Sequence, residues 1–399
     1  MSTRVATALT VILPSREQTW LLRASLQHGD AGREAWRVWR ELAGNAKTAM
    51  AEDRGGVKRL LPLLYSALRR NGAEVDAALL PYLKTVHARE QIRTATYLRI
   101  CGEVLGALER EGIPTIVLRG AAAAVTAYDD PALRHCHDIS LLVSSEDLPR
   151  AAIALRGNGL TSAMRDPGTF TTDFELRHES TLMVELHTQL FEVPFYDLPM
   201  ADVMPRTRHV SIGGKPARVL SPTDAFLHAC GHASYSPSRQ TLRWVCDVWH
   251  ILRRHPELDW DLLIQTARRS RLGLPVAVTL RYLAEELGAP VPGVVLKRVV
   301  RDAARAPAVE RDVALRGARM GSGQGPSELL RRIPGGWRVR AWVALCLLFP
   351  SRQYIREVMG VRGSFRLWAQ YALRPFDYLR ERRARHGWAT QTPMSGTAS

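Results

Sequence analysis

Residues 116–143 read IVLRGAAAAVTAYDDPALRHCHDISLLV, and this stretch decides the expected fold. A short apolar run ends at Arg119-Gly120, a helix of small residues follows, and a second apolar run begins after Asp138. A strand, a helix and a second strand in this order are typical of a sheet with helices on its faces. Further along, residues 184–187 (VELH) lie in an alternating run and predict another strand, which carries an acid.

The acids on these strands are the candidate catalytic residues. Residues two apart in a strand share a face, so Asp138 points with Ser140, and Glu185 points with His187. If the two strands are neighbours, Asp138 and Glu185 together can hold Mg²⁺ with water and phosphate oxygens. Ser140 stands where such chemistry favours a second carboxylate, so the predicted site has one negative charge fewer.

A basic residue precedes the first acid. Arg134 lies four residues before Asp138, on the predicted loop that leads into the strand. Two interpretations remain open at this point. Arg134 is either a ligand of a nucleoside triphosphate or an ordinary exposed loop arginine.

Polar residues recur at helical spacing after residue 221. His228 and His232 are four residues apart and share one helical face, which favours a polar contact between helices over a zinc site. Arg243 and Asp247 have the same spacing and predict an ion pair along one helix.

The rest of the chain is organised around this central part. Residues 1–112 are predicted to be helical, ending in a long helix over 81–109 that Gly112 and Pro114 stop. Residues 113–220 form the α/β core and include a hairpin at Gly213-Gly214. A helical C-terminal domain (221–320), a basic helical extension (321–388) and a disordered tail (389–399) complete the predicted organisation.

Composition and charge limit the classes of protein that fit. The chain has 399 residues, a net charge of +16 and five cysteines without paired spacing. No run reaches the ~18 apolar residues of a transmembrane helix, and no signal-peptide pattern is present, so we expect a cytoplasmic protein with reduced thiols. The segment 291–399 carries 20 Lys and Arg against 7 Asp and Glu. This basic third either attracts nucleic acid, an acidic partner or anionic lipid, or is a solvated helical surface.

Several short motifs, taken in order, resemble one family. The chain from about residue 16 to 290 is similar to the nucleotidyltransferase superfold, and specifically to the uncharacterised nucleotidyltransferases of the NTP_transf_5 type. The motifs that carry the resemblance are Leu118-Arg119-Gly120, Tyr128, Leu133-Arg134, residues 138–143 (DISLLV), residues 184–187 (VELH), residues 220–224 (LSPTD), His232 and residues 242–247 (LRWVCD).

The resemblance implies roles for individual residues. Arg119-Gly120 takes the place of a Lys-Gly turn that contacts phosphate, and Asp138 is the first acid. Ser140 stands at the position of the second acid, and Glu185 is the third. His187 and His232, with Arg134, are implied to line the nucleotide site.

The implied fold class is α+β, with a small mixed β-sheet nucleotidyltransferase core flanked by helical N- and C-terminal regions. The implied activity is Mg²⁺-dependent transfer of NMP from an NTP to an unknown hydroxyl or phosphate acceptor, which is a small molecule, sugar, peptide or protein. Because of Ser140, the alternative is a catalytically degenerate pseudoenzyme that binds nucleotide or a partner. Nucleic-acid binding is a third hypothesis and is not favoured, because the sequence has no helix-turn-helix or aromatic-rich strand motif.

Overall fold

A computed structural model describes most of the chain up to residue 318. The described residues are 12–162, 174–191, 196–235 and 241–318, together with positions 337, 341 and 345. The four long ranges belong to one compact unit. The predicted basic extension (321–388) and tail (389–399) lie outside the described residues apart from those three positions, and they stay predictions.

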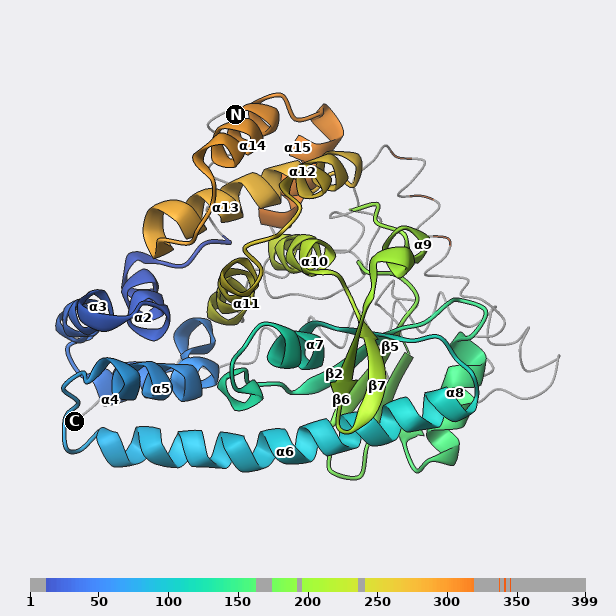
Figure 1. The fold of residues 1–399 in the computed structure, drawn as a ribbon, viewed down its shortest axis with the longest axis horizontal. Helices are drawn as coiled ribbons and strands as arrows, with labels where there is room; N and C mark the ends of the chain where they lie inside the picture. The colour runs from blue at the N-terminus through green and yellow to red at the C-terminus, as the bar shows by residue number, and fades with distance from the viewer. Residues whose placement is uncertain are drawn as a thin grey trace, which may run out of the picture. The chain divides into compact units, whose positions relative to one another are not determined.

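A mixed sheet forms the centre of this unit (Figure 1). Strands β1 and β2 are antiparallel, whereas β1 with β7 and β2 with β5 are parallel. The fold is therefore α+β, as predicted. In spatial order the seven strands of this sheet are β3 (Thr161–Ser162), β4 (Phe174–Arg177), β5 (Met183–His187), β2 (Asp138–Leu142), β1 (Ile116–Leu118), β7 (Lys215–Val219) and β6 (Arg208–Ile212).

Helices precede, interrupt and follow the sheet. Before it lie α2 (Arg16–Leu26), α3 (Gly29–Ala43), α4 (Ala46–Ala51), η1 (Arg54–Leu60), α5 (Leu61–Asn71) and α6 (Leu80–Arg110). Between strands lie α7 (Arg119–Thr126), η2 (Pro131–Leu133), α8 (Leu148–Gly157), α9 (Met200–Val203) and η3 (Met204–Arg206). After it lie α10 (Pro222–Tyr235), α11 (Thr241–Arg254), α12 (Trp260–Arg269), α13 (Gly273–Leu287), α14 (Gly293–Ala304) and α15 (Ala308–Ala318).

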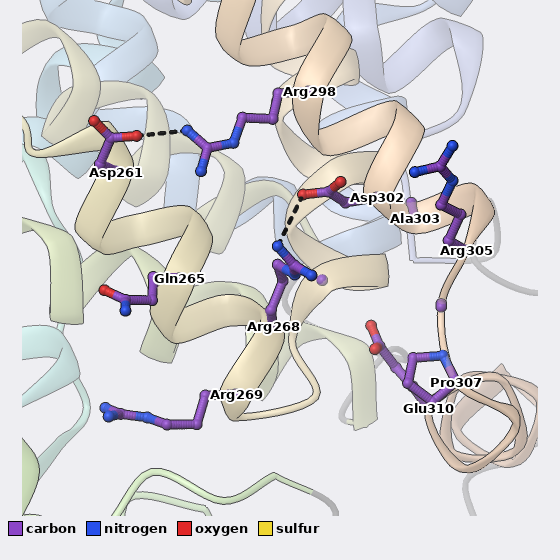
Figure 2. Close-up of a pocket in the computed structure, with 12 residues that line it drawn as sticks. Asp261, Gln265, Arg268, Arg269, Arg298, Asp302, Ala303, Arg305, Pro307 and Glu310 are labelled. Atoms are coloured by element: carbon purple, nitrogen blue, oxygen red, sulfur yellow. Dashed lines mark hydrogen bonds and ion pairs between the residues drawn. The ribbon is translucent and has the colours of Figure 1, made fainter.

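A cavity of about 770 Å³ opens among the C-terminal helices α12, α14 and α15 (Figure 2). Within it Arg298 pairs with Asp261 at 2.5 Å, and Arg268 approaches Asp302 at 4.0 Å. Two of its arginines are thus balanced by acids of the same cavity. None of the site residues predicted from the sequence lines it, so it is a separate feature of the helical region.

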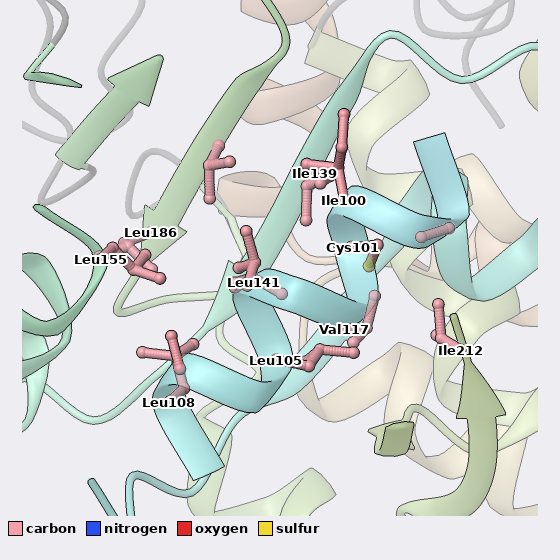
Figure 3. Close-up of a cluster of buried hydrophobic side chains, with 14 of the residues drawn as sticks. Ile100, Cys101, Leu105, Leu108, Val117, Ile139, Leu141, Leu155, Leu186 and Ile212 are labelled. Carbon is pink, nitrogen blue, oxygen red and sulfur yellow. The ribbon is translucent and has the colours of Figure 1, made fainter. Parts of the chain in front are cut away.

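The hydrophobic core lies between the sheet and α6 (Figure 3). Ile100 and Leu105 of the helix and Ile139 and Leu141 of β2 all belong to one buried cluster. Apolar residues of α6 recur at helical spacing, and those of β2 alternate with Ser140 across the strand. This packing orients β2 so that its polar residues face away from α6.

Two predictions of local structure are confirmed. The long helix predicted over 81–109 is α6 (Leu80–Arg110), and the hairpin predicted at Gly213-Gly214 joins β6 to β7. Both hairpin glycines have positive φ, +58° and +75°, as a two-residue turn that matches strand twist requires. Among the described residues, no helix combines the length and apolar character needed to cross a membrane.

The hairpin packs directly against α6 through glycine. A Cβ added to Gly102 would lie 2.4 Å from the carbonyl oxygen of Gly213. No L-residue other than glycine fits at this distance, because the opposing atom belongs to the backbone and cannot rotate away. The close approach holds the β6–β7 edge of the sheet onto the helix.

We expect Gly102→Ala to lower the free energy of unfolding by about 1–3 kcal/mol through overpacking, although alanine favours helix over glycine. Urea denaturation measures this change. Gly157→Ala in α8 is the matched control, because a Cβ there meets nothing within 4 Å. Equal midpoints for the two variants would contradict the proposed contact.

Candidate nucleotide site

The site begins where β1 passes into α7. Leu118 is the last residue of β1, and Arg119 opens the helix with φ of +52°. A non-glycine residue in this region costs of order 1 kcal/mol or more and persists only where the surroundings hold it. The surroundings here are the polar contacts of the Arg119 guanidinium, which reach β5 and α10.

The acid on β5 lies at the centre of these contacts. Ser140 and Glu185 are register partners in the parallel pair of β2 and β5. The Ser140 hydroxyl donates to Glu185 Oε2 at 3.3 Å, and Arg119 Nη2 donates to the same oxygen at 3.2 Å. The structure therefore brings together Arg119, Ser140 and Glu185, for which the resemblance implies a phosphate contact and the second and third acid positions.

Two histidines contact the same guanidinium. Arg119 Nη2 lies 2.6 Å from His187 Nε2, and Arg119 Nη1 lies 3.1 Å from His232 Nε2. A guanidinium can only donate, so Nε2 of His232 is the acceptor. Nε2 of His187 lies between this donor and an acceptor, because Glu185 Oε2 is 3.1 Å from it. Burial and then the charge of Arg119 hold the pKa of His232 well below its usual range, so this ring stays neutral.

Asp138 lies at the start of β2, on the same face of the strand as Ser140. Its side chain is 17% exposed, and Oδ1 lies 3.3 Å from Nδ1 of His137. The Tyr97 hydroxyl from α6 donates to its backbone carbonyl at 2.8 Å. Tyr97 thus holds the strand start in place, a contribution for which the sequence offers no local signal.

Arg134 and Gly120 lie close to each other. Arg134 is buried, and Nε and Nη2 donate to the two carboxylate oxygens of Asp247 at 3.1 and 2.7 Å. The interpretation of Arg134 as an exposed loop arginine is wrong, while its contact with triphosphate stays a prediction. A Cβ on Gly120 would lie 3.2 Å from Arg134 Nη1, so glycine lets α7 approach the paired guanidinium closely.

The predicted pairing along α11 also changes. Both oxygens of Asp247 are used by Arg134, and Tyr128 donates a further hydrogen bond to Asp247 Oδ1 at 2.8 Å. Arg243 instead turns toward the loop before β2 and reaches His137. The ion pair predicted between Arg243 and Asp247 from their spacing is therefore wrong, because Asp247 pairs with Arg134, 113 positions earlier in the chain.

The donors for a metal are few. Among the residues that the structure describes, no three His, Cys, Asp or Glu side chains gather as a metal-binding group. Asp138 at the start of β2 and Glu185 on β5 are the predicted acids, Glu175 of β4 is the register partner of Glu185, and Arg119 pairs with Glu185. Mg²⁺ commonly uses one or two carboxylates together with substrate phosphates and water. The donor set fits an ion that arrives with a triphosphate better than a pair of resident ions.

The mixed sheet, its acid-bearing strands and the arginine at the start of α7 define a protein of nucleotidyltransferase type. The chain belongs to the NTP_transf_5 family, described as uncharacterised nucleotidyltransferase, whose family model matches residues 56–288. The match lies inside the range of about 16–290 expected from the sequence motifs.

Two solved structures are similar to parts of the chain. One is the antibiotic-resistance factor ANT(2'')-Ia, with 16% identity over 48% of this chain and 96% of its own, and a TM-score of 0.33. The other is an antigenic nucleotidyltransferase-like protein from Paracoccidioides brasiliensis, with 16% identity over 52% of this chain and 96% of its own, and a TM-score of 0.33. A comparison with curated proteins finds no match.

A buried histidine beneath the site makes stability depend on pH. His228 Nε2 donates to the carbonyl of Leu190 at 2.9 Å, and burial lowers the pKa of His228 from 6.5 to about 3. Below pH 6.5 the unfolded chain binds a proton that the folded chain does not, so acid favours unfolding.

We expect His228→Gln, which keeps a donor for Leu190, to reduce the slope of unfolding free energy against pH by about 1.4 kcal/mol per pH unit between pH 6.5 and about 4. Denaturant unfolding across this range measures the slope. His209→Gln, at an exposed histidine of β6, is the matched control. If the free energy of unfolding depends on pH in the same way for the wild type and His228→Gln, the prediction is wrong, because His228 then makes no difference to the pH dependence of stability.

Proposed function

We propose that this chain is a Mg²⁺-dependent nucleotidyltransferase that moves NMP from an NTP to an acceptor carrying a hydroxyl or a phosphate. The observation that carries the proposal is the convergence of Arg119 and Ser140 on Glu185, with Asp138 on the same face of β2. The family supports a nucleoside triphosphate as the substrate. The acceptor is a small molecule, a sugar, a peptide or a protein.

In this proposal Asp138 and Glu185 supply oxygen ligands to the magnesium that accompanies the triphosphate. When bound, this ion neutralises phosphate charge and polarises the bond that breaks. Arg119 pairs with Glu185, and its guanidinium would donate to a phosphate oxygen of the bound triphosphate. His187 and His232 restrict the guanidinium to this small region.

A second candidate function is nucleotide binding without turnover. Ser140 contributes a hydroxyl where the resemblance implies a carboxylate, and Arg119 neutralises part of the charge of Glu185. Both features lower the negative charge available to a divalent ion. A protein with this site would bind NTP, and its release of pyrophosphate would be absent with or without an acceptor.

Isothermal titration of each NTP with and without Mg²⁺ tests the site. We expect binding that requires Mg²⁺, and a loss of at least roughly tenfold in affinity (about 1.4 kcal/mol) in Asp138→Asn, because one charged ligand is removed. Asp129→Asn, at an exposed acid that pairs with Arg254, is the matched control. Absence of NTP binding by the wild-type protein under both conditions would overturn the proposal.

Restoring an acid at residue 140 separates the two candidates. We expect Ser140→Asp to lower the Mg²⁺ concentration needed for NTP binding by roughly tenfold, because the new carboxylate lies beside Glu185. Without Mg²⁺ the two like charges should lower the melting temperature. Ser180→Asp, on an exposed turn, is the matched control. An unchanged Mg²⁺ requirement would contradict a metal position at Glu185.

Pyrophosphate release then distinguishes transfer from binding alone. Release by the wild-type protein with a suitable acceptor supports the transferase. Release by Ser140→Asp alone supports the pseudoenzyme, because it shows that the native serine is what prevents turnover.

A further inference from the structure

A buried arginine of α11 makes no ion pair within the described part of the chain. Arg243 is 9% exposed, and its Nη1 donates to the carbonyl of His135 at 3.3 Å and lies 3.1 Å from His137 Nδ1. Among the residues described by the structure, no carboxylate lies within ion-pair distance of Arg243. These two neutral acceptors satisfy hydrogen bonds, while the acids whose charge reaches Arg243, Asp247 and Asp138, form no ion pair with it.

A second arginine adds to this unbalanced charge. Arg59 belongs to η1, which packs against α11, and its charge acts on both Arg243 and His137. Its Nη1 atom is buried and has no hydrogen-bond partner in the described part of the chain. The charges of two guanidinium groups from separate elements therefore act on the same histidine, which also feels the charge of Asp138.

The electrostatic surroundings agree with this geometry. Burial, and then the charge of Arg134, lowers the pKa of Arg243 to about 9, while Asp247 opposes the shift. Arg243 is still charged at neutral pH, and Asp247 is held by Arg134 through both of its oxygens. Burying a charge without a partner is costly, so an anion that completes the site would be bound strongly.

The arginine pair lies beside the proposed reaction site. His137 Nδ1 is 3.1 Å from Arg243 Nη1 and 3.3 Å from Asp138 Oδ1. A guanidinium can only donate, so His137 Nδ1 is the acceptor of the contact with Arg243. An anion held by Arg243 would consequently lie close to the acid that starts β2.

We propose that Arg243 and Arg59 bind the terminal phosphates of the nucleoside triphosphate. The inference rests on the proposed function and names the residues that hold the polyphosphate part of its substrate. Guanidinium groups donate paired hydrogen bonds to phosphate oxygens, and two of them offset most of the charge of a β,γ-diphosphate unit. In this arrangement Arg119, at the start of α7, would bind the α-phosphate, which is attached to the nucleoside.

Titration with NTP, the corresponding NMP and inorganic tripolyphosphate tests the inference on the full chain. In Arg243→Gln we expect NTP and tripolyphosphate to bind at least tenfold more weakly and NMP to bind within twofold of wild type. Arg254→Gln, at an exposed arginine of the same helix, should leave all three affinities unchanged. Arg59→Gln, at a partly exposed residue, should also weaken the binding of NTP and tripolyphosphate but not of NMP. This variant tests the inference if Arg243→Gln does not fold.

A thermal readout gives an independent check. Because Arg243 lacks a counterion, Arg243→Gln without ligand should melt at the same temperature as the wild type or higher, and tripolyphosphate should raise the melting temperature of the wild type alone. An equal weakening of NTP and NMP, or unchanged NTP binding in both variants, would overturn the inference and leave the proposed function intact. Tripolyphosphate binding that depends on Arg243, without NTP binding, would sustain the anion site and overturn the proposed function. Binding of neither ligand by the wild type would overturn both.

Discussion

The parallel pairing of β2 with β5 is the constraint on which the site depends. Their register aligns Ser140 with Glu185, while Ile139 and Val184 are fully buried on the opposite face. A slip of one residue would exchange the faces, moving the carboxylate of Glu185 into the core and an apolar side chain into the site. The buried apolar residues thus specify where the polar ones meet.

Three arginines near this strand pair illustrate how differently one residue type is used. Arg134 has a buried carboxylate of its own and fastens the loop before β2 to α11. Arg119 shares Glu185 with Ser140 and contacts two histidines, and we propose that it exchanges Glu185 for a ligand. In the described part of the chain, Arg243 donates to neutral acceptors. In the proposals made above, the arginine with an ion pair of its own is structural, and the arginines with less balanced charge bind the ligand.

Much of the fold was predictable, because its signals are local. Apolar periodicity along 81–109 and the positive-φ glycines of the hairpin act within a few residues, so the sequence reports them directly. The resemblance of ordered motifs assigned Arg119 and Glu185 to one site, but it did not predict the ion pair between them. Arg134 pairs with Asp247, and Arg243 consequently does not, because distant segments of the chain pack together here. No local pattern encodes this packing.

Helix α6 has a consequence for how such a chain can vary in length. It runs for 31 residues, or about 46 Å, and contacts the rest of the unit at both Glu90, which meets His135, and Gly102, which meets the hairpin. Inserting or deleting one residue between those contacts would rotate one relative to the other by about 100°. We therefore expect the twelve-residue spacing from Glu90 to Gly102 to tolerate substitutions but no change in length, and insertions to be accommodated in the connecting loops.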